Sequence, residues 1–173
     1  MNGRRPGSAA RLYRTLGGHF LVQLKDILWV LFVSMLPVVE LRGAIPIGEA
    51  LGLPDWLNYV ICVAGNMLPV PVIILFAKRV LAWCAKLPKV GGFFQKIIDR
   101  ANRKANKIGD YELLGVLLFV AIPLPGTGAW TGALVAAVLQ LRMKKAFFAI
   151  LLGVLISGII VMLITNGVAF LIN

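Results

Sequence analysis

The apolar residues of this chain fall in long blocks, and not in the one-sided stripes of amphipathic helices from a soluble core. Two blocks, 56–77 and 146–172, are long enough as helices to cross a hydrocarbon layer of about 30 Å. Two others, 26–53 and 111–141, are each interrupted near the middle by glycine and proline. The pattern predicts an all-α integral membrane protein.

Each interrupted block predicts a helical hairpin that enters the membrane and returns on the same side. The arm from Asp26 to Pro37 forms only ~18 Å of helix, which is too short to cross. After the break we expect a return arm from about Ala44 to Leu53, and in the second block a return arm from Ala133. Irregular backbone is tolerated at this depth only inside protein or beside a water-filled cavity.

The two hairpins align with each other. The arms ILWVLFVSML before Pro37 and LLGVLLFVAI before Pro123 match in character, and an acidic residue stands eleven places before each proline. The Gly-Ala pairs at 43–44 and 128–129 match as well. A re-entrant hairpin makes no net crossing and the helix after it makes one, so the second copy is inverted relative to the first. Inverted repeats with broken helices are typical of many secondary transporters.

Charge separates these repeats, at 26–84 and 111–173, from two basic segments. The chain is 60% hydrophobic with a mean hydropathy of +0.89, yet its net charge is +11. The basic residues gather at 1–25 and 85–110. We expect both segments to lie on an anionic leaflet of the membrane, the second as an amphipathic helix. Because the basic residues lie between apolar blocks in helical patterning, we expect no nucleic-acid partner.

The same charges leave the orientation open. The basic connection at 85–110 and the basic turn at 142–145 are both expected on the cytoplasmic side. That arrangement leaves the basic N-terminus outside, against the same rule. Either the N-terminal segment crosses the membrane, or the first arm spans it and only the second hairpin is re-entrant.

Two motifs, ELRGAIPIG at 40–48 and PLPGTGAWTG at 123–132, carry a resemblance. With both in order, the chain resembles the putative small multidrug export family from about residue 26 onward. That family is thought to be distantly related to the DedA superfamily of re-entrant-loop proteins, which are implicated in proton-linked transport and in moving undecaprenyl phosphate or other lipids. The resemblance implies a multi-pass transporter or lipid translocase of a prokaryotic cell membrane, with proton coupling and a small-molecule or lipid-phosphate substrate.

The candidate substrate and proton site lies at the hairpin tips. The resemblance carries over Glu40, Arg42, Gly43, Pro46, Pro123, Pro125, Gly126, Thr127, Gly128 and Trp130. Asn66, just before two prolines in the first long helix, adds either a polar wall facing the tips or only a kink. Related DedA proteins have an acidic residue and arginines near the second hairpin, whereas the second break here is uncharged.

Two interpretations of Glu40 and Arg42 stay open. In the first, they form a structural salt bridge that pins the hairpin. In the second, Arg42 binds an anionic head group with its planar fork while Glu40 carries the coupled proton. A low dielectric favours the neutral form of the acid, and the nearby arginine opposes this. Each side chain can also meet a partner across the repeat, and backbone amides at 126–128 can add an uncharged anion cradle.

Other classes of function have less support. The apolar blocks contain no nucleophile–base set and no Cys/His cluster, so we expect no enzyme, no metal site and no cofactor. The alternative function is a non-transporting structural or assembly factor, in which the Glu40–Arg42 pair is purely structural. The candidate contact for a homodimer is the last helix, because small residues let another helix approach closely. These residues are Gly153, Ser157, Gly158 and Gly167.

Overall fold

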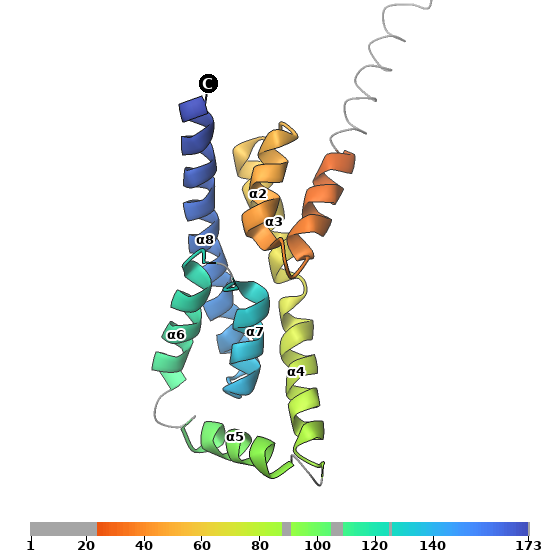
Figure 1. Ribbon diagram of the computed structural model, residues 1–173, viewed down its shortest axis with the longest axis vertical. Coiled ribbons are helices and arrows are strands. Elements are labelled where there is room, and N and C mark those ends of the chain that lie inside the picture. The colour runs from red at the N-terminus through yellow and green to blue at the C-terminus, as the bar shows by residue number, and fades with distance from the viewer. Residues whose placement is uncertain (1–23, 88–90, 105–108, 125, 173) are drawn as a thin grey trace, which may run out of the picture.

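The computed structural model describes residues 24–87, 91–104, 109–124 and 126–172, and in those ranges the secondary structure is helical, with no strand (Figure 1). The expected all-α class is confirmed for this part of the chain. Most of the predicted N-terminal segment 1–25 lies outside the described residues. After helical residues 24–35 come α2 (Glu40–Ala50), α3 (Asp55–Met67), α4 (Val70–Cys84), α5 (Gly91–Lys104), α6 (Gly109–Ala121), α7 (Ala129–Val138) and α8 (Met143–Ile172).

Two helical rods run most of the length of the molecule. Asp55–Cys84, which comprises α3 and α4, and Met143–Val168 within α8 are both long and apolar enough to cross a membrane. The first was expected to end at 77, and this boundary was wrong. The charge of Lys78 does not end the helix, because its ammonium group donates to the backbone carbonyl of Leu141 beyond α7.

The rod of α3 and α4 is interrupted at two prolines. Pro69 and Pro71 have no N–H, so the carbonyls four residues earlier, on Gly65 and Met67, lose their usual helical partners. The last bond of the α3 end joins Leu68 N to the Ala64 carbonyl at 3.1 Å. The kink expected from the sequence is therefore a real break between two helices.

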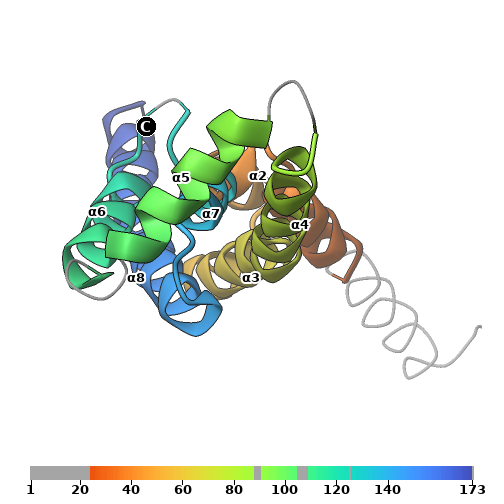
Figure 2. The ribbon, with the colours of Figure 1, turned by 90° about the horizontal axis from the view of Figure 1, so that it is seen from below.

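Two helical hairpins point toward each other along the length of the molecule, with their return helices α2 and α7 between the two rods (Figure 1). Residues 24–35 and α2 form one in the upper half of Figure 1, and α6 and α7 form the other in the lower half. Their tips, at 36–39 in the first and at 122–124 and 126–128 in the second, meet near the middle of the molecule. Helix α5 lies across the lower end of the bundle (Figure 2).

Both return helices begin four residues earlier than expected, at Glu40 and Ala129. Pro46 falls inside the expected return arm, and α2 runs through it. Proline has a φ that suits a helix, and it removes one backbone hydrogen bond from α2. Pro46 is exposed, so few neighbouring residues lie against its ring. The chain reverses just before α2, and Glu40, the first residue of that helix, has a φ of +51°.

The turns that follow the two return helices have the same hydrogen bonds, displaced by 88 positions. After α2, the amides of Leu51, Gly52 and Leu53 donate to the carbonyls of Ile47, Glu49 and Gly48. After α7, the amides of Leu139, Gln140 and Leu141 donate to the carbonyls of Val135, Ala137 and Ala136. Gly52 and Gln140 both have positive φ values, +76° and +53°. The two halves of the chain therefore turn in the same way.

Two glycines in the long helices pack directly against the first arms of the hairpins. A Cβ at Gly65 would lie 2.6 Å from the Leu31 carbonyl, and a Cβ at Gly153 would lie 2.8 Å from the Leu117 carbonyl. Gly158 likewise packs against the Tyr59 ring, whereas a Cβ at Gly167 would have nothing within 4 Å. Gly153 and Gly158 are thus used inside the chain, and of these glycines only Gly167 is left for a second copy.

Packing crosses over between the halves. Helix α3 packs against α2 of its own hairpin, while α4 packs against α7 of the other hairpin. Helix α8 does the same, contacting α6 and α7 of its own hairpin and α2 of the other. This exchange holds the two tips against each other at the level where α3 and α4 are interrupted.

Candidate functional site

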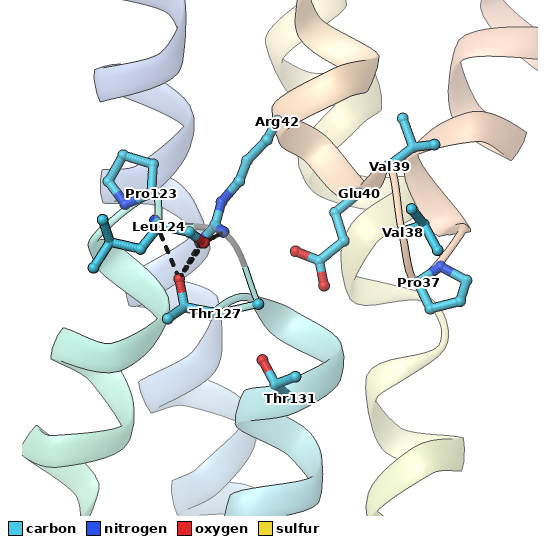
Figure 3. A pocket seen from close by; sticks show the side chains of 10 residues that line it. Pro37, Val38, Val39, Glu40, Arg42, Pro123, Leu124, Thr127 and Thr131 are labelled. Atoms are coloured by element: carbon cyan, nitrogen blue, oxygen red, sulfur yellow. Dashed lines mark hydrogen bonds between the residues drawn. The ribbon is translucent and has the colours of Figure 1, made fainter.

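Arg42 links the first hairpin to the end of α6. Its guanidinium donates to Thr127 Oγ1 at 2.9 Å and to the Leu124 carbonyl (Figure 3). It also donates to the Ile122 carbonyl at 3.2 Å. These carbonyls directly follow α6, at the helix end that carries partial negative charge. The cation therefore caps a helix C-terminus on the opposite hairpin.

Glu40 makes the complementary contact with α7. Its side chain is only 6% exposed, and one carboxylate oxygen accepts a 3.4 Å hydrogen bond from the Trp130 amide. The other oxygen lies against Gly128, the residue that precedes α7. A carboxylate at a helix N-terminus is favoured by the free amides and by the helix dipole. The acid thus caps the return helix of the second hairpin.

Glu40 and Arg42, both within the described ranges, form no ion pair with each other. The sequence offered a mutual salt bridge as one interpretation, and the geometry differs from it. Because the two residues start a helix, their side chains diverge, one toward α6 and one toward α7 (Figure 3). Each one stabilises a broken end that a hairpin leaves inside apolar surroundings.

Two further hydrogen bonds hold the tips. The Trp130 indole N–H donates to the Met35 carbonyl at 3.0 Å, at the end of the first arm. Within the second tip, the Thr127 hydroxyl is 2.8 Å from the Ile122 carbonyl and 2.9 Å from the Leu124 carbonyl. Thr127 thereby orders the same backbone segment that receives Arg42.

We call the place where Glu40 and Arg42 contact the second tip and the start of α7 the junction. A cavity of about 280 Å³ lies beside this junction. It is slightly smaller than the usual range for small-molecule sites, about 300–1,000 Å³. Both hairpins line it, with Pro37, Val38, Val39, Glu40, Arg42, Pro123, Leu124, Gly126, Thr127 and Thr131. The cavity has a carboxylate, a guanidinium and hydroxyls on otherwise apolar walls.

A second polar group lies behind Glu40. Asn66 and Ser157 are each 2% exposed, and neither Asn66 Oδ1 nor Ser157 Oγ has a hydrogen-bond partner. Together with Glu40 and Gly128, they line a narrow gap that has no room for a water molecule. Asn66 therefore faces the tips, as the functional interpretation of its position expected, as well as marking the break after α3.

The structure brings most of the predicted residues together, but not all. Gly43 lies inside α2 against Val39, and Pro46 is exposed on the same helix, so neither belongs to the junction. Pro125 lies outside the described residues. The sequence interpretation missed Ser157 as a site residue and treated it only as a small residue for helix contact. In the described ranges, no group of three or more His, Cys, Asp or Glu is placed to hold a metal.

The chain belongs to the family described as "Putative small multi-drug export protein", which matches residues 40–160. The match begins at Glu40, directly after the first tip, and includes the second tip. No curated protein and no solved structure matches the chain. The family resemblance expected from the two motifs is therefore confirmed, while the relationship to DedA proteins stays a prediction. The family and the two long apolar helices together indicate a membrane protein with a transporter-like role.

Proposed function

We propose that the protein is a secondary transporter of the cell membrane whose substrate passes where the two hairpin tips meet. The observation that carries this proposal is the position of Glu40 and Arg42 beside a cavity lined by both hairpins. Ionisable residues at membrane depth are costly and usually mark a transport site. The family name, with its reference to export, supports the same role.

In this proposal the hairpins are re-entrant and the two halves are inverted repeats. Helices α2 and α7 have 11 and 10 residues, about 15–17 Å at 1.5 Å per residue, which is too short to cross a bilayer. The repeated turn bonds, the paired glycine contacts at Gly65 and Gly153, and the exchanged packing all support the repeat. Hairpin tips that meet between inverted repeats suit alternating access.

Arg42 is the substrate-binding group in this mechanism. In the structure its planar guanidinium donates to acceptors on the second tip, so the two tips are in contact, which we call the closed state. When the tips separate, an anionic group of the substrate replaces those acceptors, because phosphate and carboxylate match the same planar fork. The substrate is then a small molecule or a lipid phosphate with an anionic group.

Glu40 is the coupling residue. In its charged form, the carboxylate is attracted to the N-terminus of α7 and stabilises the closed tips. Protonation removes this attraction, and acid therefore favours separation of the tips. One proton bound at Glu40 is in this way linked to release of Arg42 for substrate.

Transport in proteoliposomes containing a pH dye tests the proposal, with a small amphipathic anion and a lipid phosphate as alternative substrates. The comparison is wild type, Glu40→Gln and the matched control Glu49→Gln, an acid on the same helix outside the junction. We expect substrate-dependent proton movement in wild type and Glu49→Gln, and none in Glu40→Gln. If wild type moves neither substrate, the Glu40–Arg42 contacts are structural and the assembly-factor function replaces transport.

A further inference from the structure

We propose that the narrow gap beside Glu40, bounded by Asn66 and Ser157, is a binding site for a sodium ion. This inference deepens the proposed function by naming a coupling ion, and depends on that function only for the role of the ion. The site lies behind the tips, on the side of Glu40 toward α3 and α8.

Two buried polar atoms beside Glu40 have no hydrogen-bond partner. Buried oxygens nearly always have hydrogen-bond partners, and an unpaired one costs about 1–3 kcal/mol. Asn66 Oδ1 and Ser157 Oγ are both buried without partners and line the same gap as the Glu40 carboxylate. Three oxygen-bearing side chains from three helices therefore line one gap. Two of them, Asn66 and Ser157, have an oxygen there with no hydrogen-bond partner in the protein.

A helix break lies next to Asn66. The carbonyls of Gly65 and Met67, on either side of it, have no helical partner because proline stands four residues later. Freed carbonyls at the break of a membrane helix are the usual ligands of Na⁺ in transporters with discontinuous helices. The break and the side-chain oxygens thus occur at one level of the bundle.

Charge favours a monovalent ion. Glu40 is the single carboxylate that lines the gap, and the other oxygens are neutral. Divalent cations are usually held by more than one carboxylate or by several waters as well. Arg42 is the other charged residue that lines the gap, and its guanidinium is held by the end of α6. One negative charge with neutral oxygens suits Na⁺.

The size of the gap links the ion to the hairpin tips. The closed gap has no room even for a water molecule, so binding requires it to widen. Glu40 then turns away from Gly128 toward Asn66 and Ser157. The ion and the N-terminus of α7 therefore compete for one carboxylate, and a proton competes with both.

Thermal unfolding of the purified full-length protein in detergent tests the site. NaCl, KCl and choline chloride are compared at one ionic strength, because a ligand that binds only the folded protein raises Tm. We expect NaCl to raise the Tm of wild type above its value in choline chloride, and expect no such rise in Ser157→Ala or Asn66→Leu. The control is Thr165→Ala on the same helix, because the Thr165 hydroxyl already donates to the Val161 carbonyl at 2.9 Å.

Direct binding of radioactive ²²Na⁺ to the same proteins complements the melting curves, and does not depend on how much a variant is destabilised. About one ion per chain is expected for wild type and Thr165→Ala, with a loss of at least tenfold in affinity for Ser157→Ala. An equal Tm in all three salts, or unchanged ²²Na⁺ binding by Ser157→Ala, overturns the site.

The two proposals fail separately. Proton-driven transport in sodium-free proteoliposomes, with no ²²Na⁺ binding, removes the sodium site and leaves the transport function intact. Sodium binding that depends on Ser157, in a protein that transports neither test substrate, supports the site and removes the transport function.

Discussion

The Glu40 carboxylate occupies the space that a side chain at position 128 would fill. A Cβ atom at Gly128 would lie 1.8 Å from one carboxylate oxygen, so the acid rests on bare backbone. Gly128 also has a φ of +148°, which side chains rarely adopt. The contact joins residues that are far apart in the sequence and belong to opposite hairpins, and it depends on glycine.

Substitution of that glycine separates this contact from simple backbone strain. Gly128→Ala is expected to push Glu40 off the α7 N-terminus, to lower stability by about 2–3 kcal/mol and to abolish transport. The control is Gly126→Ala, since Gly126 also has positive φ (+82°) but has nothing within 4 Å of its Cβ position. Circular dichroism melting curves measure the loss of stability in both variants. Equal losses in the two variants would mean that the Glu40 contact adds nothing.

Arg42 and Thr127 are expected to be energetically coupled. Arg42→Lys keeps the charge but loses the fork that reaches two carbonyls and the Thr127 hydroxyl. A double-mutant cycle of Arg42→Lys and Thr127→Val, followed by chemical unfolding, should give an interaction free energy of about 0.5–3 kcal/mol. Strictly additive losses would show that the two residues act independently.

The Trp130 indole is expected to hold the first arm through one hydrogen bond. Trp130→Phe removes the donor to the Met35 carbonyl and should cost about 1 kcal/mol, because the carbonyl at the end of the arm is left unpaired. Trp83→Phe is the matched control, since Trp83 is 65% exposed. Melting temperatures compare them, and a Trp130→Phe protein as stable as the control would contradict this role.

The sequence predicted the helical hairpins but not where their tips lie. Hydrophobic pattern locates apolar arms, and the arms before Pro37 and Pro123 do form helices in both halves. The matched Gly-Ala pairs misled the alignment, because Gly43 lies inside α2 whereas Gly128 precedes α7. The reversal point depends on backbone angles, such as the φ of +51° at Glu40, which residue character does not encode.

The charged members of the site were predictable, but their partners were not. An acid and an arginine in apolar sequence are costly enough to indicate a site on their own. Their partners are mostly backbone atoms, such as the Leu124 carbonyl and the Trp130 amide, which every residue type has. For Ser157, no local pattern distinguishes a hydroxyl that faces Glu40 from one that eases helix packing.

In the proposed mechanism the two tips must separate for transport, and a reversible cross-link between them tests this requirement most directly. Val38 and Thr131 line the same cavity from opposite hairpins, so cysteines at both positions can be joined by a short bifunctional methanethiosulfonate reagent. Cys62 and Cys84, which are free thiols, are first replaced by alanine. The control pair, Leu124 and Thr131, joins two positions of the second hairpin alone.

Transport of substrate by the cross-linked proteins in proteoliposomes is then the deciding measurement. We expect the Val38–Thr131 cross-link to stop transport and a reducing agent to restore it, while the control cross-link leaves transport intact. Transport at the uncross-linked rate through a protein whose tips are joined would contradict the account.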